Sequence, residues 1–328
     1  GYRGLSAAAS LGSCTMYHDP KASFIDSAFT SKADWEASLK ASGASVAGGP
    51  LSACDCDFVL MGQNGFIGSK MLEAIEANYT VVVVPGIRLH QRTELRAFLE
   101  MHRPRHGVIC CSGTRGVPNI DWCDTHPVET IDANITGQLN VATICKELEL
   151  HCALLGTGFV YAGRTGKVYT EEDPPDSELP KAYIKMRIAL EQLLAYFPNV
   201  LNLRVIYPIT RDLTDKRGLI GKLSGFSKVD AATGCCTFLE DLCPLVPPMM
   251  KKKAAGNLNF SNPGTVSYEQ VVERLKARNP EYNPELRPPS GRPAIQLDCS
   301  KMLALCAPEF HVPTAEEALD KIFMQPIS

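Results

Sequence analysis

The sequence predicts an α/β protein: a doubly wound parallel sheet followed by a smaller mixed C-terminal lobe. Two observations carry this prediction. Short apolar segments of strand length alternate with segments of helical periodicity through residues 57–206, and this alternation is typical of parallel βαβ units. Residues 208–328 lose the alternation and become rich in proline. We expect them to form a lobe that closes over the carboxyl ends of the strands.

The first βα unit contains a glycine turn. Phe58–Met61 is apolar and too short for a helix, so it predicts a buried strand. Gly62, Gly65 and Gly68 follow with G-x-x-G-x-x-G spacing, and a segment of helical periodicity comes next. This order is typical of a Rossmann-like dinucleotide-binding domain, whose turn approaches a pyrophosphate at the helix N-terminus. Without the flanking strand and helix, a tight turn with no ligand would be the better interpretation. The expected cofactor contacts are Gly62, Asn64, Gly65, Phe66, Ile67 and Gly68.

The remaining elements of the sheet domain follow in order. Strands are expected at 80–84, 107–111, 151–155 and 200–206, and helices at 94–101, 128–148 and 181–196. The run of valines at 80–84 predicts a buried strand. The long helix has apolar residues for one buried face, namely Val128, Ile131, Ile135, Leu139, Ala142 and Leu148. Right-handed crossovers are expected between the parallel strands.

Composition excludes several classes of protein. The 328 residues are 45% hydrophobic and 21% charged, with a net charge of -3, as in ordinary globular proteins. The charge gives no reason to expect nucleic acid or an anionic membrane as partner, and no apolar run approaches the roughly 20 residues of a membrane span. The 13 cysteines lack paired C-x-x-C motifs, so we expect reduced, mostly buried thiols and no metal site.

Residues 1–53 form an N-terminal extension rich in Ala, Ser and Gly. Ser31 and Asp34 form a possible capping box before one short helix. The extension is either a flexible arm or a docking arm for other protein chains. The chain begins at Gly1 rather than methionine, and one interpretation is a processed chloroplast or mitochondrial protein, with a cytoplasmic protein as the alternative. The expected organisation is therefore an extension (1–53), an NAD(P)-binding domain (54–207) and a substrate-type lobe (208–328).

Three long segments point to a family: GVPNIDWCDTHPVETIDANITGQLNVA at 116–142, TEEDPP at 170–175 and NLNFSNPGTVSYEQV at 257–271. Through these segments the chain, from about residue 57 to 304, resembles the extended short-chain dehydrogenase/reductases. More narrowly, it is similar to the nucleotide-rhamnose synthase/epimerase-reductases of plants and algae, which convert UDP-4-keto-6-deoxyglucose to UDP-rhamnose with NADPH. The resemblance implies a dinucleotide and a UDP-sugar as partners.

The end of the second strand favours NADP(H). NAD enzymes usually have an acidic residue there that binds the ribose 2′-hydroxyl, but VVVVPGIRLHQR has none and provides Arg88 and Arg92. A guanidinium suits a 2′-phosphate through paired, charge-assisted hydrogen bonds. Arg88 falls on the arginine of the family's glycine-arginine-leucine segment. Two solvated surface arginines are the alternative interpretation.

The resemblance also implies catalytic residues. The family uses a Thr or Ser, a Tyr that donates a proton to the reduced carbonyl, and a Lys four residues after the Tyr. Thr157 and Tyr183 match the first two. Asn134 matches a helix asparagine that holds a proton-relay water in the family.

Two positions depart from the family pattern. The fourth residue after Tyr183 is Arg187, which keeps the charge but has a longer, planar donor group. We expect this group to overshoot the ribose or to turn to a carboxylate, and Lys185 lies on another helix face. The family's epimerase cysteine is replaced by Phe159, which has no exchangeable proton, although its partner lysine is matched by Lys222.

Two functions remain open from the sequence. In the first, the chain is an NADP(H)-binding protein with a degenerate catalytic site, serving as an accessory or structural subunit of a larger organellar assembly. The alternative is an NADPH-dependent nucleotide-sugar 4-keto-reductase that lacks the epimerase step. Arg187, Phe159 and the extension favour the first function, whereas Thr157, Tyr183 and Asn134 favour the second.

Overall fold

The structure is a computed structural model that describes residues 56–289 and 293–324. Both ranges belong to one compact unit. The extension at 1–53, with its expected helix and capping box, lies outside the described residues.

Six parallel strands form the central sheet, in the order β11-β6-β4-β3-β1-β2. The strands are β1 (Phe58–Met61), β2 (Val81–Val83), β3 (Gly107–Cys110), β4 (Cys152–Thr157), β6 (Val200–Val205) and β11 (Gly256–Phe260). Strand β1 pairs with β2 on one side and with β3 on the other, so the direction of winding reverses at β1. A parallel sheet with this reversal is doubly wound, which confirms the predicted fold class.

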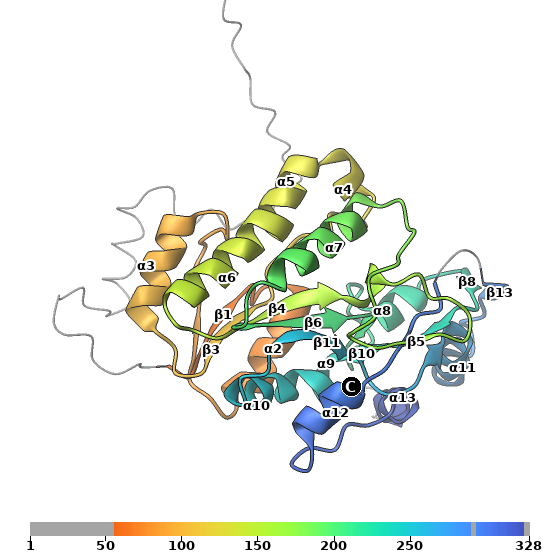
Figure 1. The fold of residues 1–328 in the computed structure, drawn as a ribbon. Coiled ribbons are helices and arrows are strands. Elements are labelled where there is room, and N and C mark those ends of the chain that lie inside the picture. The colour runs from red at the N-terminus through yellow and green to blue at the C-terminus, as the bar shows by residue number, and fades with distance from the viewer. Residues whose placement is uncertain (1–55, 290–292, 325–328) are drawn as a thin grey trace, which may run out of the picture. The chain divides into compact units, whose positions relative to one another are not determined.

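Helices cover both faces of the sheet (Figure 1). One face carries α3 (Arg92–His102), α6 (Gly137–Glu147) and α7 (Ala182–Leu194), and the other carries α2 (Phe66–Glu76), α9 (Leu239–Leu242), α10 (Val246–Lys251) and α12 (Ser300–Cys306). Phe58 and Leu60 of β1 pack with α2, whereas Val59 and Met61 pack in the opposite layer with α3 and α6. Burial on both faces explains why β1 is apolar at every position.

Strand β2 is less buried than its valines predicted. Val81 and Val82 are partly exposed and Val83 is exposed, and only Val84 beyond the strand is buried. The physical reason is its place at the edge of the sheet, where β1 is its only neighbour among the described strands. The prediction of a buried strand was wrong in this respect.

The sixth strand comes from the part of the chain expected to form the smaller lobe. Strand β11 pairs in parallel with β6, and α9, α10 and α12 pack in the core of the sheet domain. Residues 208–328 therefore contribute to the sheet domain as well as to the smaller lobe.

The helical run predicted at 128–148 is interrupted. Helix α5 (Pro127–Ile131) leads into a π-helical turn, η1 (Asp132–Thr136), and α6 follows. Val128 and Ile131 are exposed, so the prediction that they share a buried face with α6 was wrong. The wider π turn shifts the helical phase, and residues before it no longer lie in register with residues after it.

The smaller lobe has its own apolar core around α8 (Leu219–Leu223), α11 (Tyr268–Arg278) and α13 (Ala315–Met324). Its strands form short pairs: β7 (Pro208–Ile209) with β10 (Thr237–Phe238), β9 (Thr233–Gly234) with β12 (Val266–Ser267), and β8 (Lys228–Asp230) with β13 (Glu285–Arg287). A further pair joins β5 (Val168–Tyr169) to β14 (Gln296–Leu297), and short helical turns occur at α4 (Trp122–Thr125), η2 (Gly158–Val160) and η3 (Cys243–Leu245). Within the described ranges, no helix has the length and apolar content needed to cross a membrane.

Candidate active site

The glycine turn follows β1 and requires glycine at two positions. Gly62 has φ of +81°, and a Cβ there would lie 2.6 Å from the backbone nitrogen of Ser112. A Cβ on Gly68 would lie 1.9 Å from the carbonyl oxygen of Gly62. The turn closes with a 2.9 Å hydrogen bond from the Gly65 N–H to the Gly62 carbonyl oxygen. Gly62 thus lets the turn lie against the segment after β3, and Gly68 lets α2 pack closely on the turn, as a dinucleotide-binding turn requires.

The N-terminus of α2 is suited to an anion. The helix begins at Phe66, its N-cap residue Gly65 provides no side-chain cap, and its first turn contains no acidic residue. The first N–H groups of the helix and their partial positive charge are therefore available to a phosphate. Asn64 and Gly65 are exposed, and Phe66 and Ile67 are partly buried. The residues present thus fit a dinucleotide pyrophosphate.

The turn lies where a ligand is expected in this topology. It follows the carboxyl end of β1, and Ser112 beside it follows the carboxyl end of the neighbouring β3. Because the winding of the sheet reverses between these two strands, their carboxyl ends flank the topological switch point.

The two arginines after β2 have different surroundings. Arg92 donates to Thr143 Oγ1 at 2.6 Å and to Glu147 at 2.7 Å, so its guanidinium is held against α6. Arg88 is exposed, and its guanidinium makes no hydrogen bond or ion pair with any described residue. Arg88 is therefore free to meet a ligand, whereas Arg92 is a structural residue.

Thr157 and Tyr183 lie on elements that contact each other. Thr157 ends β4, is buried, and accepts a 3.3 Å hydrogen bond from the Phe159 N–H. Tyr183 lies in the first turn of α7 and is partly exposed. Helix α7 packs against both β4 and the η2 turn that follows Thr157.

Arg187 points into the protein rather than toward solvent. Its Nη1 donates to the Leu155 carbonyl oxygen at 3.1 Å, and its Nη2 donates to Asn134 Oδ1 at 3.4 Å. Its Nε is buried without a partner among the described residues. The expectation that this group turns to a carboxylate was wrong, because neutral oxygens of β4 and η1 hold it. The guanidinium carbon lies 5.3 Å from the centre of the Tyr183 ring.

Asn134 is fully buried in the π turn and fixes the segment after β3. Its Nδ2 donates to the Thr114 carbonyl oxygen at 2.6 Å, and its Oδ1 accepts from the Thr114 N–H at 2.9 Å. Its Oδ1 also accepts from Arg187. The π turn presents this amide inward, and such turns are frequent at functional sites.

The two positions connected with epimerisation differ in chemistry. Phe159 packs edge-on against Tyr207, with ring centres 4.9 Å apart, and presents only hydrocarbon. Lys222 on α8 is partly buried, and burial together with the nearby Arg115 lowers the pKa of its ammonium group. A lysine with a lowered pKa is suited to proton transfer, but no described interaction joins it to Phe159.

Three residues of the site were not predicted: Ser112, Thr114 and Gln138. Ser112 and Thr114 follow β3, and the Gln138 Nε2 donates to the Ser112 carbonyl oxygen at 2.6 Å. The carboxyl end of β3 was a usable signal, because ligands bind there in doubly wound sheets.

No cluster of metal-ligating side chains occurs in the described part of the chain. Its cysteines are free, and all of them except Cys111 are buried. Burial raises the pKa of the Cys110 thiol to about 12. Cys123 is among the buried thiols, and buried thiols are usually inert.

Comparison with known proteins decides the family. The NAD dependent epimerase/dehydratase family matches residues 58–211. A bifunctional dTDP-4-dehydrorhamnose 3,5-epimerase/dTDP-4-dehydrorhamnose reductase of Arabidopsis thaliana is 34% identical over 231 residues, which are 69% of this chain and 76% of the relative. The chain belongs to the NAD dependent epimerase/dehydratase family.

Larger relatives and a solved structure agree with this membership. A trifunctional UDP-glucose 4,6-dehydratase/UDP-4-keto-6-deoxy-D-glucose 3,5-epimerase/UDP-4-keto-L-rhamnose-reductase of Arabidopsis thaliana is 34% identical over 232 residues, which are 69% of this chain but only 34% of that protein. This chain thus spans about a third of the trifunctional relative. The crystal structure of the L780 UDP-rhamnose synthase from Acanthamoeba polyphaga mimivirus has a TM-score of 0.73 at 24% identity, over 82% of this chain and 98% of that one, which is a likeness of fold.

Proposed function

We propose that this family member binds NADP(H) at the glycine turn and a UDP-sugar beside it, and that its hydride-transfer step is impaired. The observation that carries the proposal is the position of Arg187. The resemblance implies a lysine that interacts with both the phenol and the nicotinamide ribose. Arg187 instead donates hydrogen bonds to the Leu155 carbonyl and to Asn134.

Reduction of a keto-sugar needs both a hydride donor and a proton donor at the site. Reduction of a keto-sugar adds a hydride to carbon 4 and a proton to the carbonyl oxygen, and bound NADPH supplies the hydride. Tyr183 is the proposed donor of the proton. Two hydrogen bonds to neutral oxygens hold the buried guanidinium away from the role of the family's lysine. The cofactor then remains bound through the turn while its nicotinamide end has a weaker contact.

A second candidate function is a 4-keto-reductase without epimerase activity. The observation that favours it is the 5.3 Å between the Arg187 guanidinium carbon and the centre of the Tyr183 ring. A cation this close to the ring still lies beside the proposed proton donor. Under this alternative, reduction would be slow rather than absent.

The role that fits an impaired enzyme is that of an accessory or structural subunit in a larger assembly, in a chloroplast or mitochondrion. Residues 1–53 are the proposed contact to other chains. Affinity purification of the tagged chain from its own cells, followed by mass spectrometry, tests this role. Recovery of this chain alone, in a particle of its own mass, would contradict it.

Cofactor preference is tested by titrating NADPH and NADH into the purified chain and following ligand fluorescence. We expect tighter binding of NADPH, and we expect Arg88→Gln to lose about 10- to 100-fold in NADPH affinity, since a hydrogen bond to a charged group contributes about 1.5–3 kcal/mol. NADH affinity should not change. Arg96→Gln is the control, because Arg96 pairs with Glu147 and Glu100 on the surface. Equal affinities for both cofactors in the natural chain would contradict the assignment of Arg88.

A further inference from the structure

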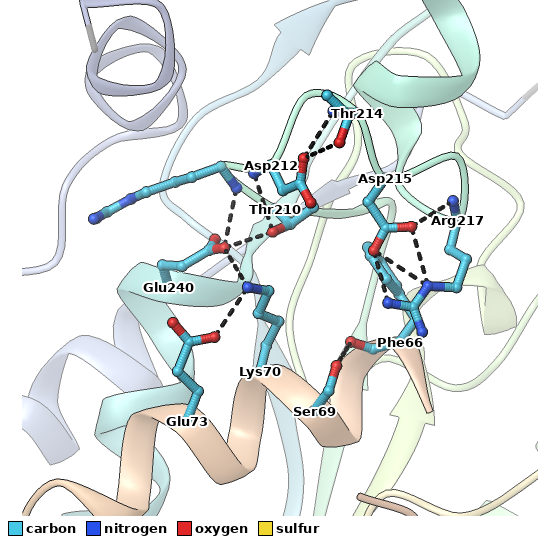
Figure 2. A network of polar contacts seen from close by, with 11 residues as sticks. Phe66, Ser69, Lys70, Glu73, Thr210, Asp212, Thr214, Asp215, Arg217 and Glu240 are labelled. Carbon is cyan, nitrogen blue, oxygen red and sulfur yellow. Dashed lines mark hydrogen bonds and ion pairs between the residues drawn. The ribbon is translucent and has the colours of Figure 1, made fainter. Parts of the chain in front are cut away.

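The segment between β7 and α8 lies against the N-terminal end of α2 (Figure 2). The Arg217 guanidinium carbon is 5.5 Å from the centre of the Phe66 ring. A Cβ on Gly218 would lie 3.3 Å from the tip of the same ring. Phe66 is the first residue of α2, so Arg217 and the glycine turn share one end of this helix.

The position of Arg217 is fixed by Asp215. The Nε of Arg217 donates to the Asp215 carboxylate at 3.0 Å, and its Nη2 donates to the second carboxylate oxygen at 2.8 Å. Asp215 is itself anchored, because its carbonyl oxygen accepts from the Gly218 N–H at 3.0 Å and packs closely against Gly221. The turn therefore holds the guanidinium in one orientation, with little side-chain entropy left to lose on binding.

Arg217 retains unused donors in this arrangement. Its Nη1 makes no hydrogen bond with any described residue, and the side chain is 51% exposed. The guanidinium carbon lies over the Phe66 ring, and the Nη1 N–H groups remain available to a ligand. A planar guanidinium with free in-plane donors is suited to phosphate oxygens.

We infer that Arg217 is a diphosphate-binding residue of this site. The inference rests on the proposed binding of a dinucleotide and a nucleotide sugar, and it adds a contact that neither the glycine turn nor Arg88 supplies. The diphosphate has two possible sources, the pyrophosphate of the dinucleotide and the diphosphate of the nucleotide sugar. Stacking on the first residue of α2 favours the dinucleotide.

The experiment compares Arg217→Gln with the natural chain in titrations with NADP, NAD and UDP by calorimetry. Arg287→Gln is the matched control, because Arg287 is 44% exposed and also pairs with a carboxylate two residues earlier, Glu285. We expect Arg217→Gln to weaken NADP and NAD binding by the same factor, about tenfold, since both carry the pyrophosphate. A loss confined to UDP would also support the inference and would assign the nucleotide sugar as the source.

Unchanged affinity for all three ligands would overturn the inference, as would a loss confined to NADP, which would indicate the 2′-phosphate. If Arg217→Gln melts at a lower temperature than the natural chain, Arg217→Lys replaces it, and a smaller parallel loss for NADP and NAD is expected. A natural chain that binds neither NADP nor NAD would refute the proposed function instead. In that case the UDP titration would still decide the role of Arg217.

Discussion

At the scale of single residues, the proposal depends on Arg187 and Phe159, which stand where the family resemblance implies a lysine and a cysteine. Arg187 is turned inward to the Leu155 carbonyl, and Phe159 presents an aromatic ring packed on Tyr207. Neither side chain contacts the glycine turn in any described interaction. Under the proposal, cofactor binding and hydride transfer therefore depend on different residues.

Phe159 predicts that protons on the sugar do not exchange. With UDP-4-keto-6-deoxyglucose in deuterated water, we expect no deuterium at carbons 3 and 5, because a phenyl ring can neither donate nor accept a proton. Proton NMR of the recovered sugar measures this, with an epimerase-reductase relative as the positive control. Deuterium at either carbon, introduced by the natural chain, would mean that another group replaces the missing acid.

At the scale of elements, α7 is tied to the sheet by a buried ion pair. Arg204 of β6 and Glu191 of α7 are 1% and 6% exposed and form two hydrogen bonds. Arg204 also donates to the Tyr161 hydroxyl at 2.5 Å, and Asn202 donates to Glu191 at 3.2 Å. Because α7 also carries Tyr183 and Arg187, this network fixes the helix that presents the candidate catalytic groups.

Breaking this pair should destabilise the fold strongly. We expect Arg204→Met to lower the free energy of unfolding by about 3–5 kcal/mol, because Glu191 is left buried without its partner. The double variant Arg204→Met/Glu191→Leu should lose less. Urea denaturation measures both. Arg164→Met, which removes an exposed partner of Asp176, is the control, and its loss should be small because solvent screens an exposed ion pair. A loss for Arg204→Met no larger than that of the control would contradict this account.

The turn at 170–173 gives a prediction about pH. Hydrogen bonds from Lys167 and from the Thr170 N–H and hydroxyl lower the pKa of Asp173 to about 2. A lowered pKa contributes stability above the unfolded value of about 3.9, and this stability is lost as pH falls through about 2. We therefore expect Asp173→Asn to lower the melting temperature at pH 5, by an amount that shrinks toward pH 2. A difference that stays constant over this range would show that Asp173 is not the titrating group.

At the scale of the whole molecule, sequence patterns predict those elements whose geometry is set by neighbouring residues. The apolar run at Phe58–Met61 and the spacing of Gly62, Gly65 and Gly68 were enough for β1, its turn and α2, because neighbouring residues set that geometry. The edge position of β2, the return of β11 to the sheet and the stacking of Arg217 on Phe66 depend on residues far apart in the chain. These three features could therefore not be predicted from short sequence patterns.

For the site, the sequence predicted the positions of residues along the chain but not their contacts. The sequence placed Thr157 at the end of β4 and Tyr183 on a helix, and the structure has both there. It did not reveal that Arg187 donates a hydrogen bond to the Leu155 carbonyl. The partner of this guanidinium depends on which carbonyl oxygens lie near it in the folded sheet. The π turn that buries Asn134 likewise has no pattern distinct from an ordinary helix.

The central claim is that the cofactor binds while hydride transfer is impaired by Arg187. The most direct test measures NADPH oxidation with UDP-4-keto-sugar for the natural chain and for Arg187→Lys, with Lys185→Arg, an exposed position on the same helix, as the control. We predict little or no turnover for the natural chain and the control. For Arg187→Lys we predict measurable turnover, with NADPH affinity equal to or tighter than that of the natural chain. Rapid turnover by the natural chain, slowed by Arg187→Lys, would contradict the claim.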